Sequence, residues 1–110
     1  MLYLGRTMPS PFNSPATFIH LGPIVTLRGT RECVSYYKLL YDEVAERAAK
    51  KIGTIPDEQY RVLWDNLPIW FKMRRLESFF EEKKTTLVVT TYANSWGGYS
   101  NIDVTRTSEV

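Results

Sequence analysis

The sequence has little of what defines several large protein classes. It contains one cysteine, Cys33, among 110 residues, which excludes an internal disulfide and favours a reducing compartment. Its apolar runs fall far short of the roughly 20 residues that cross a bilayer. The apolar start at Met1 is also too short for a signal peptide. We therefore expect a cytoplasmic protein with no membrane partner.

The chain also has little excess of either charge, because 14 basic and 12 acidic residues leave a net charge of +2. Binding to nucleic acid requires lysine and arginine concentrated on one face. Here basic and acidic residues alternate, as in 42–51 and 72–84, which is typical of helix faces exposed to solvent. The sequence therefore predicts no nucleic-acid partner.

Common signatures of catalysis and metal binding are missing as well. The sequence has no glycine-rich phosphate loop, no nucleophile elbow and no metal-ligand spacing. The lone His20, between Ile19 and Leu21, fits a partly buried histidine with satisfied hydrogen bonds better than a catalyst. We interpret Cys33 as structural, and one cysteine cannot hold an iron–sulfur cluster, which takes several thiolates. No metal site is expected in this chain.

What is present begins with a segment rich in proline and glycine, at 1–30. These residues break any long helix or central strand, so we interpret the segment as a Pro-rich linker between lobes. Short apolar pieces at 18–21 and 24–27 predict brief strands or a connector. The sequence ends with a polar tail at 97–110, for which we expect a loop.

Between these segments the pattern predicts a helix at 31–51, capped by Thr30 and stopped by Gly53. Its apolar stripe has spacings of three and four: Val34, Tyr37, Tyr41, Val44 and Ala48.

A β-prone run at 60–64, a helix from Pro68 to Lys83 and a second β-prone run at 86–92 follow in order. The stripe expected to be buried on this helix consists of Ile69, Trp70, Met73, Leu76, Phe79 and Phe80. Strand, helix and strand in this order predict a parallel pair of strands with a right-handed crossover. The predicted fold class is thus α/β: a βαβ unit flanked by helices over 31–96, part of a Rossmann- or flavodoxin-like lobe.

The candidate site follows from this topology, because ligands of open parallel sheets bind outside the carboxyl ends of the strands. The loops at 65–68 and 92–96 should therefore meet at one pocket, with the helix that begins near Pro68 directing its N–H groups into it. We expect catalytic hydrogen-bond donors at Asn94 and Ser95. Substrate-binding residues are predicted to be Trp64, Asn66, Trp70, Tyr92 and Trp96.

Each of these residues also has a purely structural interpretation. Asn66 could serve only as a helix cap, Trp64 and Trp70 as core residues, and Asn94 as a residue that shapes a turn. For Asn94, Ser95 and Trp96 the site is favoured, because a Trp beside the Gly-Gly pair at 97–98 is a poor packing solution.

Three stretches carry a resemblance to a known family. They are PIVTLRGT at 23–30 with YYKLL at 36–40, EQYRVLWDNLPIW at 58–70, and VVTTYANSW at 88–96. They resemble subunits of the 2-hydroxyacyl-CoA dehydratase and benzoyl-CoA reductase family, and within it the 2-hydroxyglutaryl-CoA dehydratase branch most. The resemblance extends from about Arg6 to Trp96.

The resemblance implies an enzyme far larger than this chain. Family subunits have two α/β lobes with a [4Fe-4S] cluster between them, a second dehydratase subunit, and an ATP-hydrolysing activator protein that injects one electron. The thioester of the acyl-CoA substrate becomes a ketyl radical anion, which permits the elimination of water. The cluster cysteines are absent here, and we expect them before Met1 and after Val110 in a full subunit. We interpret the chain as an inactive fragment that lines part of the acyl-CoA pocket and carries no cofactor itself.

Two alternatives stay open at this stage: a fragment of an ATP-dependent benzoyl-CoA reductase subunit, and a non-catalytic α/β interaction module. The flanking gene sequence would separate enzyme from module. Paired cysteines on either side indicate the enzyme, and a stop codon directly after Val110 indicates the module.

Overall fold

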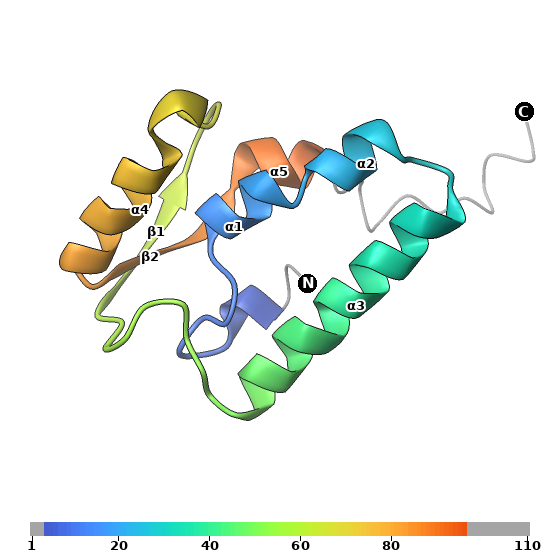
Figure 1. The fold of residues 1–110 in the computed structure, drawn as a ribbon. Coiled ribbons are helices and arrows are strands. Elements are labelled where there is room, and N and C mark those ends of the chain that lie inside the picture. Colours follow the sequence, from blue (N-terminus) through green and yellow to red (C-terminus); the bar gives the residue numbers. More distant parts are fainter. Residues whose placement is uncertain (1–3, 97–110) are drawn as a thin grey trace, which may run out of the picture.

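Two parallel strands form a sheet in the computed structural model, which describes residues 4–96 (Figure 1). They are β1, Tyr60–Trp64, and β2, Thr85–Thr90, and they pair from Tyr60↔Thr85 to Trp64↔Thr90 with an irregularity between Val62 and Leu63. The helix α4, Met73–Glu82, connects them after a short 3-10 turn, η2, at Trp70–Lys72. This arrangement confirms the predicted βαβ unit with parallel strands and flanking helices.

The long helix α3, Arg31–Ala49, confirms the predicted helix and its first cap. The Thr30 hydroxyl accepts a hydrogen bond from the Cys33 N–H at 3.2 Å. The predicted stop at Gly53 is wrong, because the left-handed residue after the helix is Lys51, with φ +55°. Gly53 instead permits a close approach, since a Cβ there would lie 2.6 Å from the Cβ of Pro9.

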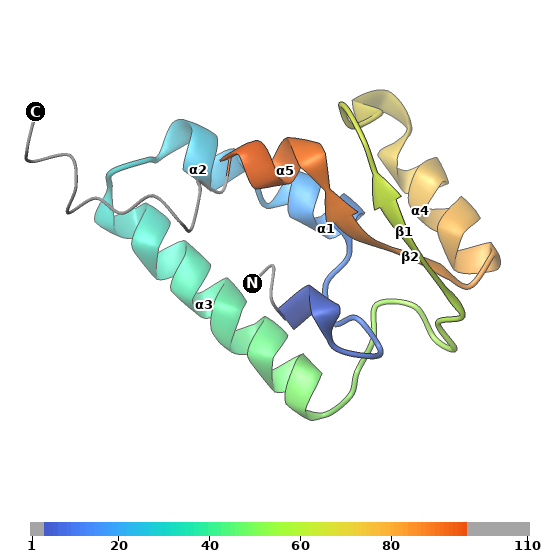
Figure 2. The same ribbon diagram turned by 180° about the vertical axis from the view of Figure 1, so that it is seen from behind.

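The buried face of α3 agrees with the predicted stripe only in part. Val44 is buried as predicted, but the other buried residues are Cys33 and Leu40. Val34 of the stripe is 70% exposed, and Tyr41 is exposed as well. The prediction placed the core along the most regular apolar spacing. In the structure α3 packs mainly against the N-terminal elements, which lie along one side of it (Figure 2). These contacts bury a stripe of residues that is rotated about the helix axis relative to the predicted stripe.

The N-terminal segment is helical, so of the two alternatives expected at 18–21 and 24–27, brief strands or a connector, the strands are wrong. It contains η1, Leu4–Arg6, then α1, Ser14–Ile19, and α2, Gly22–Thr26. Each of the two α-helices has a proline in its first turn, Pro15 and Pro23, where the missing N–H costs nothing. Asn13 caps α1 by accepting a hydrogen bond from the Ala16 N–H at 2.9 Å.

The two strands differ in how well they are covered. Helix α1 and η1 pack against β2, Phe18 is 1% exposed, and the Ser14 hydroxyl donates to the Leu87 carbonyl at 2.9 Å. On β1, Tyr60 is 62% exposed and Leu63 is 59% exposed. The core of the described unit therefore lies around β2.

Two further expectations need correction at the ends of the strands. The helix expected from Pro68 begins at Met73, and none of the residues of α4 is fully buried, although the helix packs on β2. Within its predicted stripe, Trp70 is 53% and Phe79 is 51% exposed. The expected loop at 92–96 is a short helix, α5, Thr91–Trp96.

The predicted tail at 97–110 lies outside the described residues. Over the part of the chain that is described, no helix combines the length and apolar character needed to span a bilayer.

Candidate functional site at the carboxyl ends of the strands

The connection that leaves β1 is a tight turn held by its own side chains. Asn66 has φ +80°, a left-handed conformation that asparagine tolerates better than most residues, and its Oδ1 accepts from the Leu67 N–H at 2.8 Å. The Trp64 indole N–H donates to the Leu67 carbonyl at 3.2 Å. Asn66 therefore shapes the turn after β1, and the cap predicted for it at a helix start is not found there.

A single threonine joins this turn to the end of β2. The Thr91 hydroxyl donates to Oδ1 of Asp65 at 2.7 Å and accepts from the Asn66 N–H at 3.1 Å. Thr91 is the first residue of α5, so these bonds tie the start of that helix to the end of β1. The segments that follow the two strands are thus neighbours, as the parallel topology predicts.

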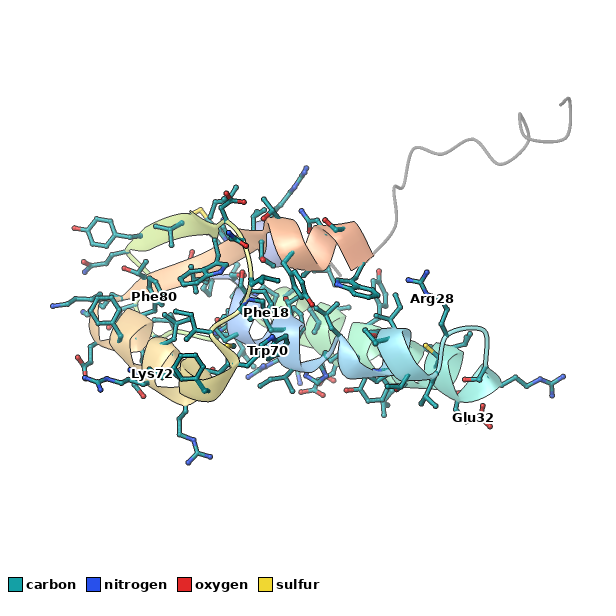
Figure 3. The ribbon with its side chains drawn as sticks, turned by 90° about the horizontal axis from the view of Figure 1, so that it is seen from above. Phe18, Arg28, Glu32, Trp70, Lys72 and Phe80 are labelled. Carbon is teal, nitrogen blue, oxygen red and sulfur yellow. The ribbon has the colours of Figure 1, made fainter. Side chains whose placement is uncertain are left out.

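An aromatic cluster lies beside this junction and comprises Phe18, Trp70, Tyr92 and Trp96. Ring centroids lie 6.2 Å apart for Phe18 and Trp70, 6.4 Å for Phe18 and Tyr92, 6.5 Å for Trp70 and Tyr92, and 6.4 Å for Tyr92 and Trp96, all in edge-to-face arrangements. Phe18 and Trp70 are seen close together in Figure 3.

The aromatic cluster contains three of the predicted substrate-binding residues and one residue that was missed. Trp70, Tyr92 and Trp96 come together, whereas Trp64 makes no ring contact with them within residues 4–96. Phe18 was missed because it comes from α1, more than 70 residues before Trp96, and no local pattern predicts that packing. Phe18 is buried, while half of Trp70 and a third of Trp96 remain exposed.

The two predicted hydrogen-bond donors, Asn94 and Ser95, lie on α5 and differ in whether the donor group is already hydrogen-bonded. The Ser95 hydroxyl donates to the Thr91 carbonyl at 3.0 Å, so its proton is already used within the helix. Asn94 is exposed, and its amide has no hydrogen-bond partner within residues 4–96. Asn94 can therefore donate to a ligand without breaking an existing bond, unlike Ser95.

A largely buried ion pair lies at the start of β1 and was also missed by sequence reasoning. Glu58 and Arg61 approach to 2.7 Å between Oε1 and Nε, in an orientation that makes the contact an ion pair more than a hydrogen bond, and the Glu58 side chain is 3% exposed. Glu58 Oε2 accepts from the Ser10 N–H and from the Thr86 hydroxyl, both at 2.9 Å. Opposite charges three residues apart at the start of a strand were the available signal.

The guanidinium of Arg61 completes this network on the N-terminal segment. It donates to the carbonyls of Gly5 at 2.8 Å, Thr7 at 2.7 Å and Arg6 at 3.2 Å. Because the ion pair lies at the start of β1, it holds the N-terminal segment at the amino end of the strand, opposite the candidate site.

His20 is partly buried and Cys33 is buried, and the structural roles expected for them stay predictions. His20 Nδ1 lies 2.5 Å from the Tyr36 hydroxyl, and burial lowers the pKa of His20, partly offset by the nearby charge of Glu43. Cys33 is buried, and its thiol contacts the Pro23 carbonyl at 3.6 Å.

The fit of a metal or cluster can be judged from the donor set. Residues 4–96 hold no group of three His, Cys, Asp or Glu side chains arranged for a metal ion. Cys33 is the sole cysteine of the sequence, and a [4Fe-4S] cluster takes several thiolates. The residues present therefore do not fit the cluster that the resemblance implies.

Comparison with known proteins identifies relatives among dehydratase and reductase subunits. The family described as "2-hydroxyglutaryl-CoA dehydratase, D-component" matches residues 1–110. The alpha subunit of (R)-2-hydroxyglutaryl-CoA dehydratase from Acidaminococcus fermentans is 30% identical over 97 residues, which covers 86% of this chain and 20% of that protein. The alpha subunit of (R)-phenyllactyl-CoA dehydratase from Clostridium sporogenes is 31% identical, over 86% of this chain and 24% of that protein.

A benzoyl-CoA reductase subunit from Thauera aromatica is 28% identical over 107 residues, which covers 90% of this chain and 25% of that protein. The chain thus spans about a fifth to a quarter of the length of these relatives. The family match over the whole sequence confirms the resemblance seen in its three motifs, and the chain belongs to the 2-hydroxyglutaryl-CoA dehydratase D-component family.

Proposed function

We propose that this chain is part of a 2-hydroxyacyl-CoA dehydratase subunit and forms one side of its acyl-CoA pocket, at the carboxyl ends of β1 and β2. One observation supports this most. In a chain of this family, Thr91 ties the two strand ends together, and the exposed rings of Trp70 and Trp96 lie beside that junction. Ligands of parallel sheets bind at this edge, and their pockets are lined mainly by apolar and aromatic groups.

The residues of this edge have distinct roles in the proposed pocket. Trp70, Tyr92 and Trp96 offer ring faces and edges against which an acyl chain packs. The Asn94 amide donates to the thioester oxygen as negative charge develops on it. A helix starting near Pro68 no longer contributes, because α4 begins at Met73.

The proposal extends to the complete enzyme by way of the resemblance. A complete enzyme of this kind would need a second subunit, an ATP-hydrolysing activator and a [4Fe-4S] cluster. The relatives are themselves named as single subunits of dehydratases or a reductase, which supports a partner subunit. Because Cys33 is the sole cysteine and is buried, we propose that other parts of the enzyme hold the cluster and that this chain contributes to substrate binding.

A second candidate is the same role in a benzoyl-CoA reductase. The match to the Thauera aromatica reductase covers 90% of this chain, slightly more than either dehydratase alpha subunit above. Its identity of 28% is lower than theirs, at 30% and 31%. The dehydratase is therefore the first choice. A comparison of the affinities for a 2-hydroxyacyl-CoA and for benzoyl-CoA decides between the two candidates.

Titration of the chain with (R)-2-hydroxyglutaryl-CoA and with benzoyl-CoA, followed by tryptophan fluorescence, tests the proposal. We expect a saturable change that is strongly reduced in Trp70→Phe and Trp96→Phe. Trp64→Phe is the matched control and should keep the change, because Trp64 lies outside the aromatic cluster. If neither thioester alters the fluorescence of a chain that circular dichroism shows to be folded, the proposed pocket does not exist.

A further inference from the structure

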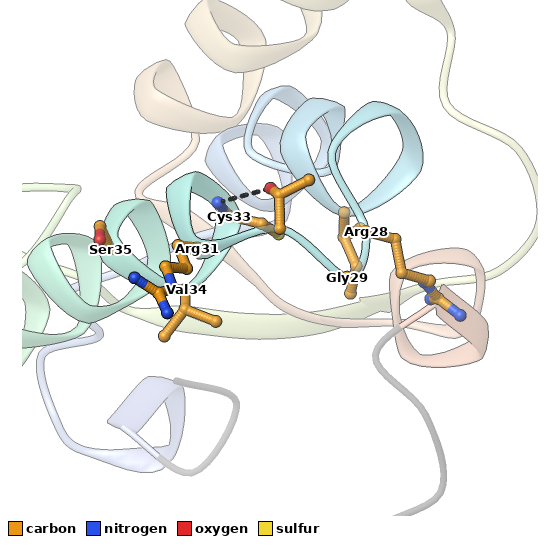
Figure 4. Close-up of a pocket in the computed structure, with 8 residues that line it drawn as sticks. Arg28, Gly29, Arg31, Cys33, Val34 and Ser35 are labelled. Carbon is orange, nitrogen blue, oxygen red and sulfur yellow. Dashed lines mark hydrogen bonds between the residues drawn. The ribbon is translucent and has the colours of Figure 1, made fainter.

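A pocket lies away from the strand ends, at the corner where α2 leads into α3 (Figure 4). It is open to solvent and has a volume of about 570 Å³. Ile24, Cys33 and Val34 give it an apolar lining, and Arg28 and Arg31 contribute the charged side chains. We call it the corner pocket.

The charge of the corner pocket is of one sign. Arg28 and Arg31 lie on opposite sides of it in Figure 4, and both are exposed. Glu32, the neighbouring acidic residue in sequence, is not among the residues that line it, and Figure 3 shows Glu32 and Arg28 pointing in opposite directions. Two arginines and no acidic residue therefore line the pocket, and the Arg28 guanidinium lies towards α5.

A direct contact links the corner pocket to the proposed acyl site. Arg28 Nη2 donates to the carbonyl of Trp96 at 3.2 Å, at the last residue of α5. The first residue of α5 is Thr91, which joins the two strand ends. Six helical residues span about 9 Å. The strand ends and the corner pocket thus lie at the two ends of one short helix.

We propose that the corner pocket binds the phosphorylated nucleotide end of coenzyme A, while the acyl thioester lies at the carboxyl ends of β1 and β2. This inference rests on the proposed function and assigns the second half of the same ligand. Coenzyme A carries its acyl group on one end of a flexible arm and an adenosine with phosphate groups on the other. Guanidinium groups bind phosphates through paired, charge-assisted hydrogen bonds, and the apolar lining suits the flat adenine.

The chain's affinities for an acyl-CoA and for the same acyl group on pantetheine, which lacks the nucleotide, test the inference. The unsubstituted chain should bind the acyl-CoA at least tenfold more tightly, and rising salt should reduce that difference. Arg31→Gln should weaken acyl-CoA binding about tenfold and leave the pantetheine thioester unchanged. Arg28→Lys keeps the charge and should lose less affinity than Arg28→Gln.

The matched control is Arg75→Gln, an exposed arginine on α4 that is far from the lining of the corner pocket. It should bind both thioesters as the unsubstituted chain does. Equal loss in Arg75→Gln and Arg31→Gln would show a general charge effect and overturn the inference. If Arg28→Gln and Arg31→Gln bind acyl-CoA normally, the inference is wrong and the proposed function stands. If the unsubstituted chain binds neither thioester, both fail.

Discussion

Asn94 is the residue on whose chemistry the proposed site depends most. Its amide is exposed and has no hydrogen-bond partner within residues 4–96, so it can donate to a thioester oxygen. In the complete enzyme, Asn94→Ala should lower kcat on the order of a hundredfold, or about 3 kcal/mol of transition-state stabilisation. Steady-state kinetics with saturating acyl-CoA measure this loss.

Ser95→Ala provides the comparison on the same helix. The Ser95 hydroxyl donates to the Thr91 carbonyl, so removing it should change kcat much less than Asn94→Ala does. Unchanged kcat in Asn94→Ala would show that Asn94 has no catalytic role and that α5 is only structural.

Glu58 is the residue on which the stability of the unit depends most. Glu58→Gln removes the buried partner of Arg61 while nearly keeping the size of the side chain. Arg61 is a quarter exposed and keeps its carbonyl acceptors, so loss of its charged partner should lower the free energy of unfolding by about 2 kcal/mol, measured by urea denaturation. Glu46→Gln breaks an exposed pair with Lys50 and should have no measurable effect. Equal midpoints for the two variants would contradict the importance of the buried pair.

At this scale, sequence reasoning found residues that share a strand end but not those that arrive from elsewhere in the chain. Trp70, Tyr92 and Trp96 could be placed together because the parallel topology fixes where strands end. Phe18 could not, because its contact with them depends on how α1 packs on β2. Arg61 was likewise invisible as an anchor, since its acceptors are backbone carbonyls of the N-terminal segment, which carry no sequence signal.

Among the elements, α3 offers two adjacent leucines with opposite surroundings. Leu40 is 9% exposed and Leu39 is 72% exposed. Leu40→Ala should lower the free energy of unfolding by about 3 kcal/mol, because it removes buried methyl groups and leaves a cavity. Leu39→Ala should cost much less, and equilibrium denaturation of both variants measures the difference. A larger loss at Leu39 would mean that the buried face of α3 had been assigned to the wrong side.

Elements were predictable where a local pattern determines them, as for α3, β1 and β2. Periodicity and the Thr30 cap suffice for a helix, and β-branched residues bounded by polar ones suffice for a strand. The face that a helix buries depends on its neighbours, which is why the stripe on α3 was misplaced. The helices α1 and α2 were missed because prolines were taken as helix breakers, although Pro15 and Pro23 lie in first turns, where they are tolerated.

The whole described unit leaves much apolar surface uncovered. Val34 and Leu39 on α3 are 70% and 72% exposed, Leu63 on β1 is 59% exposed, and Phe71 is 84% exposed. Exposed apolar patches favour association, so the isolated chain should self-associate as its concentration rises. Light scattering measures this, and Phe71→Lys should shift the profile towards the monomer. A strictly monomeric profile at high concentration would contradict the expectation.

The two strands differ in how much of each is covered, and this difference bears on where a further strand could join the sheet. The β2 side is occupied, because the Ser14 hydroxyl donates to the Leu87 carbonyl and α1, with its buried Phe18, packs against β2. The β1 side still presents Tyr60 and Leu63 to solvent. A parallel pair gains most from a third strand, since such sheets are stable when both faces and edges are covered. Any strand that extends this sheet, whatever its source, would meet less cover on β1 than on β2, where α1 and η1 already pack.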